Sequence, residues 1–258
     1  MRGEGPIPRS RRLVFATLIA LAIGHAAQAQ QIGSTAEAHN NVSRELAGAA
    51  AALTAGDSVF RDEIVHTAAE STAKLVFLDS TNLAIGPMSR VTLDVFVYSG
   101  QASAQKMTVN LAKGLFRFTT GALDKRAYVI STPTASIGVR GTVLDIGVQG
   151  PQQMRVTLVE GQALVCPRRP GITFEQQVRN CTQGGGGRCE CLDLNHAGQT
   201  AQVKKSGGAN EATFVSTPVD FASLCSGGGS LCSGSNYASL TPGGGGGGGF
   251  PSGALCGH

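Results

Sequence analysis

The sequence predicts an all-β protein, and three features of it support that prediction. From Asp57 onward, short runs rich in Val, Ile, Leu, Phe and Thr recur about every ten residues, with turn-forming residues between them. Apolar and polar residues alternate inside several runs, and residues 57–166 leave no room for a long helix. Because only one or two turn residues separate the runs, we expect stacked short strands in a β-helix-like array, with a β-sandwich as the alternative.

The first 29 residues have the three-part pattern of a secretory signal peptide. Four arginines precede an apolar run from Leu13 to Ile23, which is too short to span a bilayer, and Ala27-Gln28-Ala29 supplies small residues for cleavage. We therefore expect residues 1–29 to be removed, no later transmembrane span, and a periplasmic or secreted mature protein. Without the leader's four arginines and one glutamate, the net charge falls from +4 to +1, and no basic cluster suggests a nucleic-acid partner.

Residues 30–55 form an Ala-rich lead-in, in which Val42 to Leu53 could be a short helix or an edge strand. The β-domain is expected over residues 56–203. Half-buried strands are predicted where apolar residues alternate. These residues are Val91, Leu93, Val95 and Val97, then Met107, Val109 and Leu111, then Met154, Val156 and Leu158. The short run LFRFT is predicted as a separate strand between Gly114 and Gly121.

The run Ser131 to Ile146, STPTASIGVRGTVLDI, contains the most distinctive turn of the chain, formed by Gly138, Val139, Arg140, Gly141 and Thr142. It lacks the spacing of a phosphate-binding loop and is followed by a strand instead of a helix. Glycines inside a strand pattern usually mark a bend or a close backbone approach. We therefore predict a corner between two strands, with Val139 in the core. Arg140 is then solvated, paired with Asp145 or Asp79, or in contact with a partner.

The seven cysteines all lie between Cys166 and Cys256. In an exported chain such a group more often forms disulfides than a metal site, so the candidate disulfide cysteines are Cys166, Cys181, Cys189, Cys191, Cys225 and Cys232. A four-thiolate zinc site made of Cys166, Cys181, Cys189 and Cys191 is a less favoured alternative, because the Cys189-Glu190-Cys191 spacing lacks the usual two-residue spacer. No metal and no cofactor are predicted.

Residues 204–258 are predicted to be a flexible tail. They are rich in Gly, Ser and Cys and include seven consecutive glycines at 243–249, a composition that buries too little apolar surface to offset the entropy of ordering.

Catalytic residues are not evident in the sequence. After the leader, the histidines are His39, His66, His196 and His258, and no Gly-x-Ser-x-Gly elbow precedes a helix. We therefore predict that the protein is not an enzyme. A hydrolase that cleaves glycan or ester bonds in the cell envelope is the alternative from another functional class.

Four ordered blocks carry a resemblance to a known family. They are GDSVFRDEIVHTAAESTAKLVFLDSTNLAIGPMSRVTLDVFVY, LAKGLFRFTTG, AYVISTPTASIGVRGT and VTLVEGQALV, within residues 56–166. Together they closely resemble the FecR-type periplasmic domain, in which the run matched by Ser131 to Thr142 is a hallmark without a known catalytic role; HAGQTAQV at 196–203 is similar to the family's closing strand. The resemblance implies a β-rich, non-catalytic module whose best-known members sense an occupied siderophore receptor and regulate a sigma factor.

These features lead to a functional expectation. Sigma-regulating members of the family begin with a cytoplasmic segment and a membrane helix, whereas this sequence begins with a predicted leader. We therefore expect a stand-alone, exported FecR-like protein that binds or scaffolds another envelope component, with a protein or an envelope polymer as its partner. The alternative is an accessory of iron-uptake signalling that acts through a TonB-dependent receptor or a membrane-anchored regulator.

Overall fold

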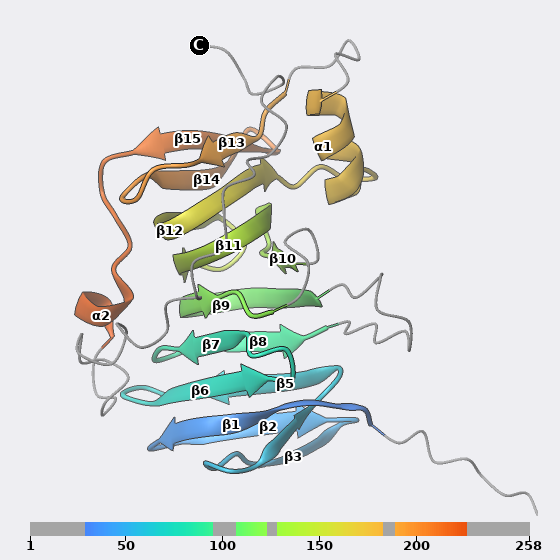
Figure 1. Cartoon of the computed structure of the whole chain (residues 1–258), viewed down its shortest axis with the longest axis vertical. Helices are drawn as coiled ribbons and strands as arrows, with labels where there is room; N and C mark the ends of the chain where they lie inside the picture. The colour runs from blue at the N-terminus through green and yellow to red at the C-terminus, as the bar shows by residue number, and fades with distance from the viewer. Residues whose placement is uncertain (1–28, 95–106, 123–127, 183–188, 226–258) are drawn as a thin grey trace, which may run out of the picture.

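The computed structural model describes residues 29–94, 107–122, 128–182 and 189–225. Their strands join into one 15-stranded sheet, so the predicted all-β class is confirmed. The strands stack along the long axis of the molecule (Figure 1), as the evenly spaced runs predicted. The predicted signal peptide lies outside the described residues except for its last residue, Ala29.

The element bounds are as follows. The first eight strands are β1 (Gln31–His39), β2 (Val42–Leu46), β3 (Ala49–Ala52), β4 (Ser58–Phe60), β5 (Glu63–Thr67), β6 (Thr72–Phe77), β7 (Asn82–Ile85) and β8 (Arg90–Leu93). The later strands are β9 (Met107–Thr119), β10 (Tyr128–Ser131), β11 (Ala135–Val148), β12 (Gln153–Pro167), β13 (Leu192–Leu194), β14 (Thr200–Ser206) and β15 (Ala209–Val215). The helices are α1 (Phe174–Thr182) and α2 (Phe221–Leu224).

Strand pairing divides the sheet into two ladders that share three long strands. The first ladder runs through β4, β1, β6 and β7, the C-terminal halves of β9 and β11, the N-terminal half of β12, and then β14 and β15. The second runs through β3, β2, β5 and β8, the N-terminal half of β9, β10, the N-terminal half of β11, the C-terminal half of β12, and β13. Among these pairings only β9–β10 is parallel.

The hydrophobic core lies between the two ladders. Alternate residues of each strand point inward, and one buried cluster combines Leu83 and Phe116 of the first ladder with Val65 and Val109 of the second. The architecture therefore combines features of both predicted alternatives: strands stacked along one axis, and two walls packed face to face as in a sandwich.

The structure decides one open alternative and corrects one expected boundary. The lead-in at 30–55 contributes β1 and the β2–β3 hairpin to the sheet, which assigns residues 42–46 and 49–52 to strands and not to a helix. The predicted tail begins too early at residue 204, because β15 pairs with β14 over seven residue pairs and α2 follows at Phe221. Apolar residues in this stretch, Val219 and Phe221, are buried and give it the packing that the composition of the whole tail concealed. Residues 226–258, with Cys232, Cys256 and His258, lie outside the described residues.

The helices of the described residues are short. α1 spans nine residues and α2 spans four. Within the described ranges, no helix combines the length and apolarity needed to cross a membrane.

Candidate binding surface

The three long strands pass from one ladder to the other at glycines with positive φ. Gly114 lies in β9, Gly141 in β11 and Gly161 in β12, with φ angles of 121°, 57° and 86°. The β11–β12 register shifts between Arg140 and Val143, where the chain bends. As a result, stretches expected to be separate strands on either side of Gly114 and of Gly141 are single bent strands.

Gly141 and Gly161 face each other across this bend. A Cβ atom built on Gly161 would lie 1.9 Å from the carbonyl oxygen of Gly141, whereas one built on Gly141 would meet nothing within 4 Å. Gly161 is therefore required both by its backbone angle and by the close approach of the two strands. Gly141 is required by its backbone angle alone.

Thr142 stabilises the corner through a network of hydrogen bonds. Its hydroxyl donates to the carbonyl oxygen of Gln162 at 2.7 Å and accepts from the backbone N–H of Arg140 at 2.8 Å. Its own N–H donates to the Thr120 hydroxyl at 2.8 Å. The structure places Val139 in the core, with 1% of its surface exposed.

The two remaining residues of the predicted turn lie in different environments. Gly138 lies under α1, where a Cβ would come within 2.5 Å of the Phe174 ring, so it allows the helix to pack closely. Arg140 is half-buried. The two carboxylates considered as its partners bind other groups: Asp145 binds Arg117, and Asp79 accepts hydrogen bonds from Tyr128 and Thr81.

A second buried polar arrangement, which the sequence did not indicate, lies on the outer face of the first ladder. Five residues lie directly opposite one another on neighbouring strands and form a cross-strand row: Ala84, Arg117, Asp145, Thr157 and Thr200. Arg117 Nε and Nη2 donate to the two Asp145 carboxylate oxygens at 2.5 and 2.6 Å. The Thr157 and Thr200 hydroxyls are 2.9 Å apart. These outer positions would ordinarily be exposed to solvent, yet Asp145 is only 2% exposed and Thr157 6%.

The segment that covers the row is the end of the described chain, residues 216–225, which we call the strap. It leaves β15 and descends along the side of the sheet to α2 (Figure 1). The backbone N–H of Val219 donates to the Thr157 hydroxyl at 2.7 Å, and that of Phe221 donates to Asp145 Oδ2 at 2.9 Å. The Phe221 side chain is fully buried, packs with Ala84 and Leu115, and lies 5.9 Å from the Arg117 guanidinium carbon.

An open cavity of about 490 Å³ lies beside the strap. Leu115, Gly147 and Val148 of the sheet line it together with Val219 and Leu224 of the strap. Met88, which also lines it, is 59% exposed and has a φ of +53°, a conformation that is uncommon for a methionine. The cavity also has the polar lining residues Lys113, Gln149, Gln153 and Arg155, so it is a mixed, mainly apolar hollow next to a segment that is already docked.

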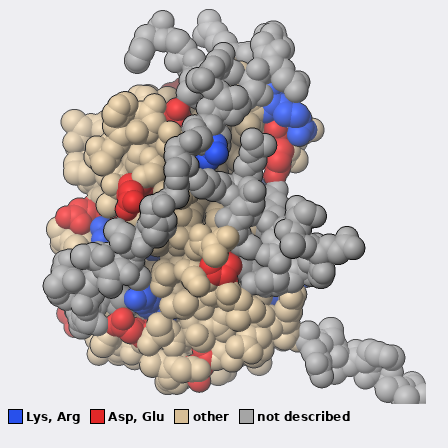
Figure 2. Space-filling view, in the orientation of Figure 1, with Lys and Arg blue, Asp and Glu red and all other residues tan. Residues whose placement is uncertain are grey.

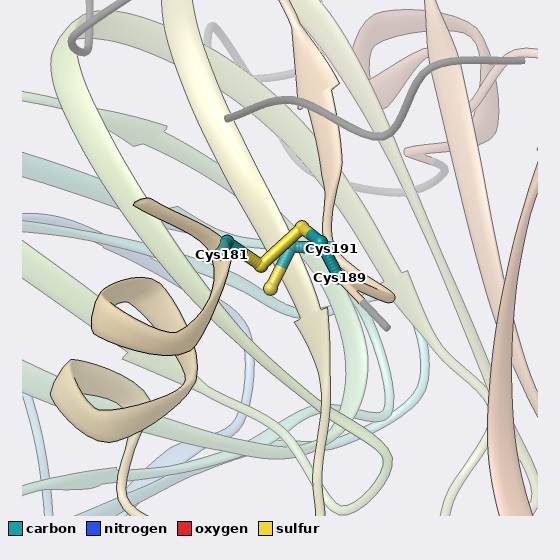
Figure 3. Close-up of side chains that lie close together, drawn as sticks. All are labelled: Cys181, Cys189 and Cys191. Carbon is teal, nitrogen blue, oxygen red and sulfur yellow. A yellow bond between two sulfur atoms is a disulfide. The ribbon is translucent and has the colours of Figure 1, made fainter. Parts of the chain in front are cut away.

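Four of the six candidate cysteines form two disulfides near α1. Cys166 pairs with Cys191, and Cys181 pairs with Cys189. The Sγ atoms of Cys181, Cys189 and Cys191 lie within 4.8 Å of one another (Figure 3), and the two disulfides account for this grouping. Cys225 is also disulfide-bonded.

The other titratable groups of interest make contacts within the fold. Glu63 is fully buried, and this burial raises the pKa of its carboxyl although Phe60 N–H and Arg44 both donate to it. Burial, and then the positive charge of Arg90, lower the pKa of His66, whose Nε2 lies 2.9 Å from Arg90 Nη1. On the face shown in Figure 2, basic and acidic residues are interspersed on a largely uncharged surface.

Comparisons with known proteins give one family match. Residues 63–164 match the family model described as FecR protein. The chain therefore carries a FecR domain. The matched region contains the glycine corner and four of the five residues of the cross-strand row, while Thr200 and the strap lie beyond it. No curated protein matches the chain.

Two solved structures resemble the chain distantly. Both are crystal structures of a provisionally assigned anti-sigma factor from Parabacteroides distasonis. One has 12% identity and a TM-score of 0.41, with 58% of this chain and 59% of that chain covered. The other has 13% identity and a TM-score of 0.43, with 62% and 64% covered. The chain thus spans about three fifths of each of these structures, a likeness too distant to bear on function.

Proposed function

We propose that this chain is a non-catalytic, exported regulator or scaffold that acts by binding another component of the cell envelope through its FecR domain. The observation that carries the proposal is the FecR match over residues 63–164, which covers the centre of both ladders. Proteins of this family are non-enzymatic and interact with other proteins in signalling. A protein partner is therefore favoured over an envelope polymer.

The contacts of the described polar residues support a binding role over hydrolysis. The Asp145 carboxylate is bonded to Arg117 and to the backbone of the strap, and His66 lies against Arg90, which lowers its pKa. The His39 Nε2 atom lies 3.8 Å from Glu37 on an accessible strand. Each of these groups has a neighbour that explains its position without a substrate.

The proposal is tested by crosslinking in cells. The full chain is expressed with an affinity tag at its C-terminus, crosslinked in the envelope fraction and purified, and the partners are identified by mass spectrometry. The Arg140→Ala chain provides a matched comparison, because Arg140 is the half-buried cation of the corner. We expect a discrete envelope protein to be recovered, in lower yield from Arg140→Ala if the corner takes part in binding.

The identity of the recovered component separates the possible roles. A TonB-dependent receptor or a membrane-anchored regulator would indicate a role in iron-uptake signalling, whereas wall or matrix components would indicate a scaffold. Recovery of the tagged chain alone, with no crosslinked partner under several growth conditions, would contradict the proposal.

A further inference from the structure

We propose that the cross-strand row on the outer face of the first ladder is a docking site for an extended peptide segment of a partner protein, and that the strap is its intramolecular occupant. The proposal rests on the proposed function, because it names the surface through which the FecR domain would bind. The partner segment would carry a β-branched residue, any residue, and then an aromatic residue, as in Val219-Asp220-Phe221.

The row recognises the backbone of the segment that lies on it. Thr157 Oγ1 accepts the N–H of Val219, and Asp145 Oδ2 accepts the N–H of Phe221, two residues further along. Alternate N–H groups of an extended chain point in the same direction, so two acceptors on neighbouring strands can read positions i and i+2. The strap contributes only backbone N–H groups to these two hydrogen bonds. A segment of another protein can therefore make them equally well.

Specificity would come from the apolar side chains. Phe221 has no exposed surface and lies over Ala84, Leu115 and the Arg117 guanidinium, while Val219 is 3% exposed and lies over Gly147. A Cβ at position 147 would already contact both Val219 methyl groups at 3.6 to 3.7 Å. The site therefore favours a medium-sized β-branched side chain followed by a ring.

The charges of the row explain why the site is kept occupied. Arg117 and Asp145 are 9% and 2% exposed although they lie on an outer sheet face. A buried charge requires all of its hydrogen bonds. If the strap left, Asp145 and Thr157 would each lose a donor, so an incoming segment that donates two N–H groups would restore what the strap supplied.

The cavity beside the strap offers a place where exchange can begin. It is lined by Val219 and Leu224 on one side and by Leu115 and Val148 on the other, and Leu224 is 57% exposed. A partner segment can bury apolar side chains there before the strap is displaced. The site and its occupant also come from different parts of the chain: most of the row lies inside the FecR match, and the strap lies more than 50 residues beyond its end at residue 164.

The test uses the full chain and a fluorescein-labelled peptide, STPVDFASL, which corresponds to residues 216–224. Fluorescence anisotropy compares its affinity for the wild type, for Phe221→Ala and for Phe214→Ala. Phe214 is the matched control, because it is an exposed phenylalanine on β15 that pairs with the core residue Ala201 and so lies on the other face of the sheet from the row. We expect Phe221→Ala to bind the peptide at least tenfold more tightly than the wild type, because its own strap competes less well. Phe214→Ala should behave as the wild type.

Further measurements make each outcome decisive. A peptide with alanine in place of Val219 and Phe221 should not bind. If the Phe221→Ala protein does not fold, Val219→Ala is a second variant in which the strap binds the row more weakly. The absence of peptide binding to both folded variants would overturn the site, as would equal affinity for the wild type and both variants. If the wild type instead exchanges straps between copies, seen as a dimer by light scattering that Phe221→Ala abolishes, the occupant is a second copy and the proposed partner is wrong.

The same variants separate this proposal from the proposed function. An envelope partner crosslinked in equal yield to the wild type and to Phe221→Ala would leave the proposed function standing and would overturn the docking site. A higher yield from Phe221→Ala would support both.

Discussion

The glycine corner and the strap both fix buried polar groups to the sheet, but they do so over very different distances in the sequence. At the corner, Thr142 is bonded to groups that lie two to 22 residues away. In the strap, Val219 and Phe221 bind groups that are 62 and 76 residues away. The corner is therefore part of the domain's own backbone geometry, whereas the strap is a distant segment of the chain whose backbone is bound by side chains of the sheet.

The largest expected effect comes from replacing Asp145, whose carboxylate accepts a hydrogen bond from the backbone of the strap. Asp145→Ala leaves Arg117 buried without its carboxylate and removes the acceptor for Phe221 N–H, so we expect a loss of about 3 to 5 kcal/mol in the free energy of unfolding. Urea denaturation measures the loss. Glu160→Ala, an exposed carboxylate on β12, is the control and should change stability by less than about 0.5 kcal/mol.

A double variant sharpens this result. Arg117→Met combined with Asp145→Leu replaces the ion pair by apolar side chains and should recover a large part of the lost stability, because no buried charge remains. The strap would still lose one backbone acceptor. If the double variant were as unstable as Asp145→Ala, the loss would come from the strap contact and not from the unpaired arginine.

At the corner, the largest effect is expected at Gly161. Gly161→Ala forces a left-handed alanine and brings its Cβ within 1.9 Å of the Gly141 oxygen, so we expect a loss of about 3 kcal/mol from the two costs together. Gly150→Ala is the matched control. Its φ is +67° and the space around it is open, so only the backbone cost of about 1 kcal/mol should appear. Equal losses in the free energy of unfolding for Gly161→Ala and Gly150→Ala would show that β11 and β12 can move apart at the corner without a cost in free energy.

A smaller effect is expected within the predicted turn itself. Gly141→Val places a β-branched residue at a φ of +57° and should lower the free energy of unfolding by more than about 1 kcal/mol. Arg140→Ala keeps both glycines of the turn and should lower the melting temperature by less than Gly141→Val does. Thermal melts of the two variants decide this, and equal, small shifts would contradict the structural role of the turn.

The two regions also differ in how far the sequence could predict them. The corner was predictable, because Gly138 and Gly141 interrupt an alternating strand pattern within a few residues. The second glycine of the contact, Gly161, was not singled out, because its role depends on β12 crossing β11 at that point. Nothing local identified the strap: Val219 and Phe221 sit in a Gly- and Ser-rich stretch, and their burial depends on the outer face of a sheet formed elsewhere. Arg117 was not singled out, and Asp145 was considered only as a partner of Arg140, since only the strand register places Arg117 and Asp145 side by side.

Glu63 provides the smallest expected effect and a contrast with Asp145. Both are buried carboxylates beside an arginine, but Asp145 has partners on both oxygens, whereas Glu63 Oε1 has no hydrogen-bond partner among the described residues. Burial raises the pKa of Glu63 above its ordinary value of 4.5. The folded state therefore binds this proton more tightly than the unfolded state, so the stabilisation is present below about pH 4.5 and is lost as the pH rises through the raised pKa.

Glu63→Gln removes that titration while keeping the shape of the side chain and its acceptor oxygen. We expect the free energy of unfolding of the wild type, relative to the variant, to fall as the pH rises above about 4.5, measured by urea denaturation in steps of pH. Glu160→Gln, which makes the same substitution at an exposed position of β12, is the matched control. A difference between the wild type and Glu63→Gln that rises with pH would mean that the charge and hydrogen bond of Arg44 outweigh the effect of burial on the pKa of Glu63.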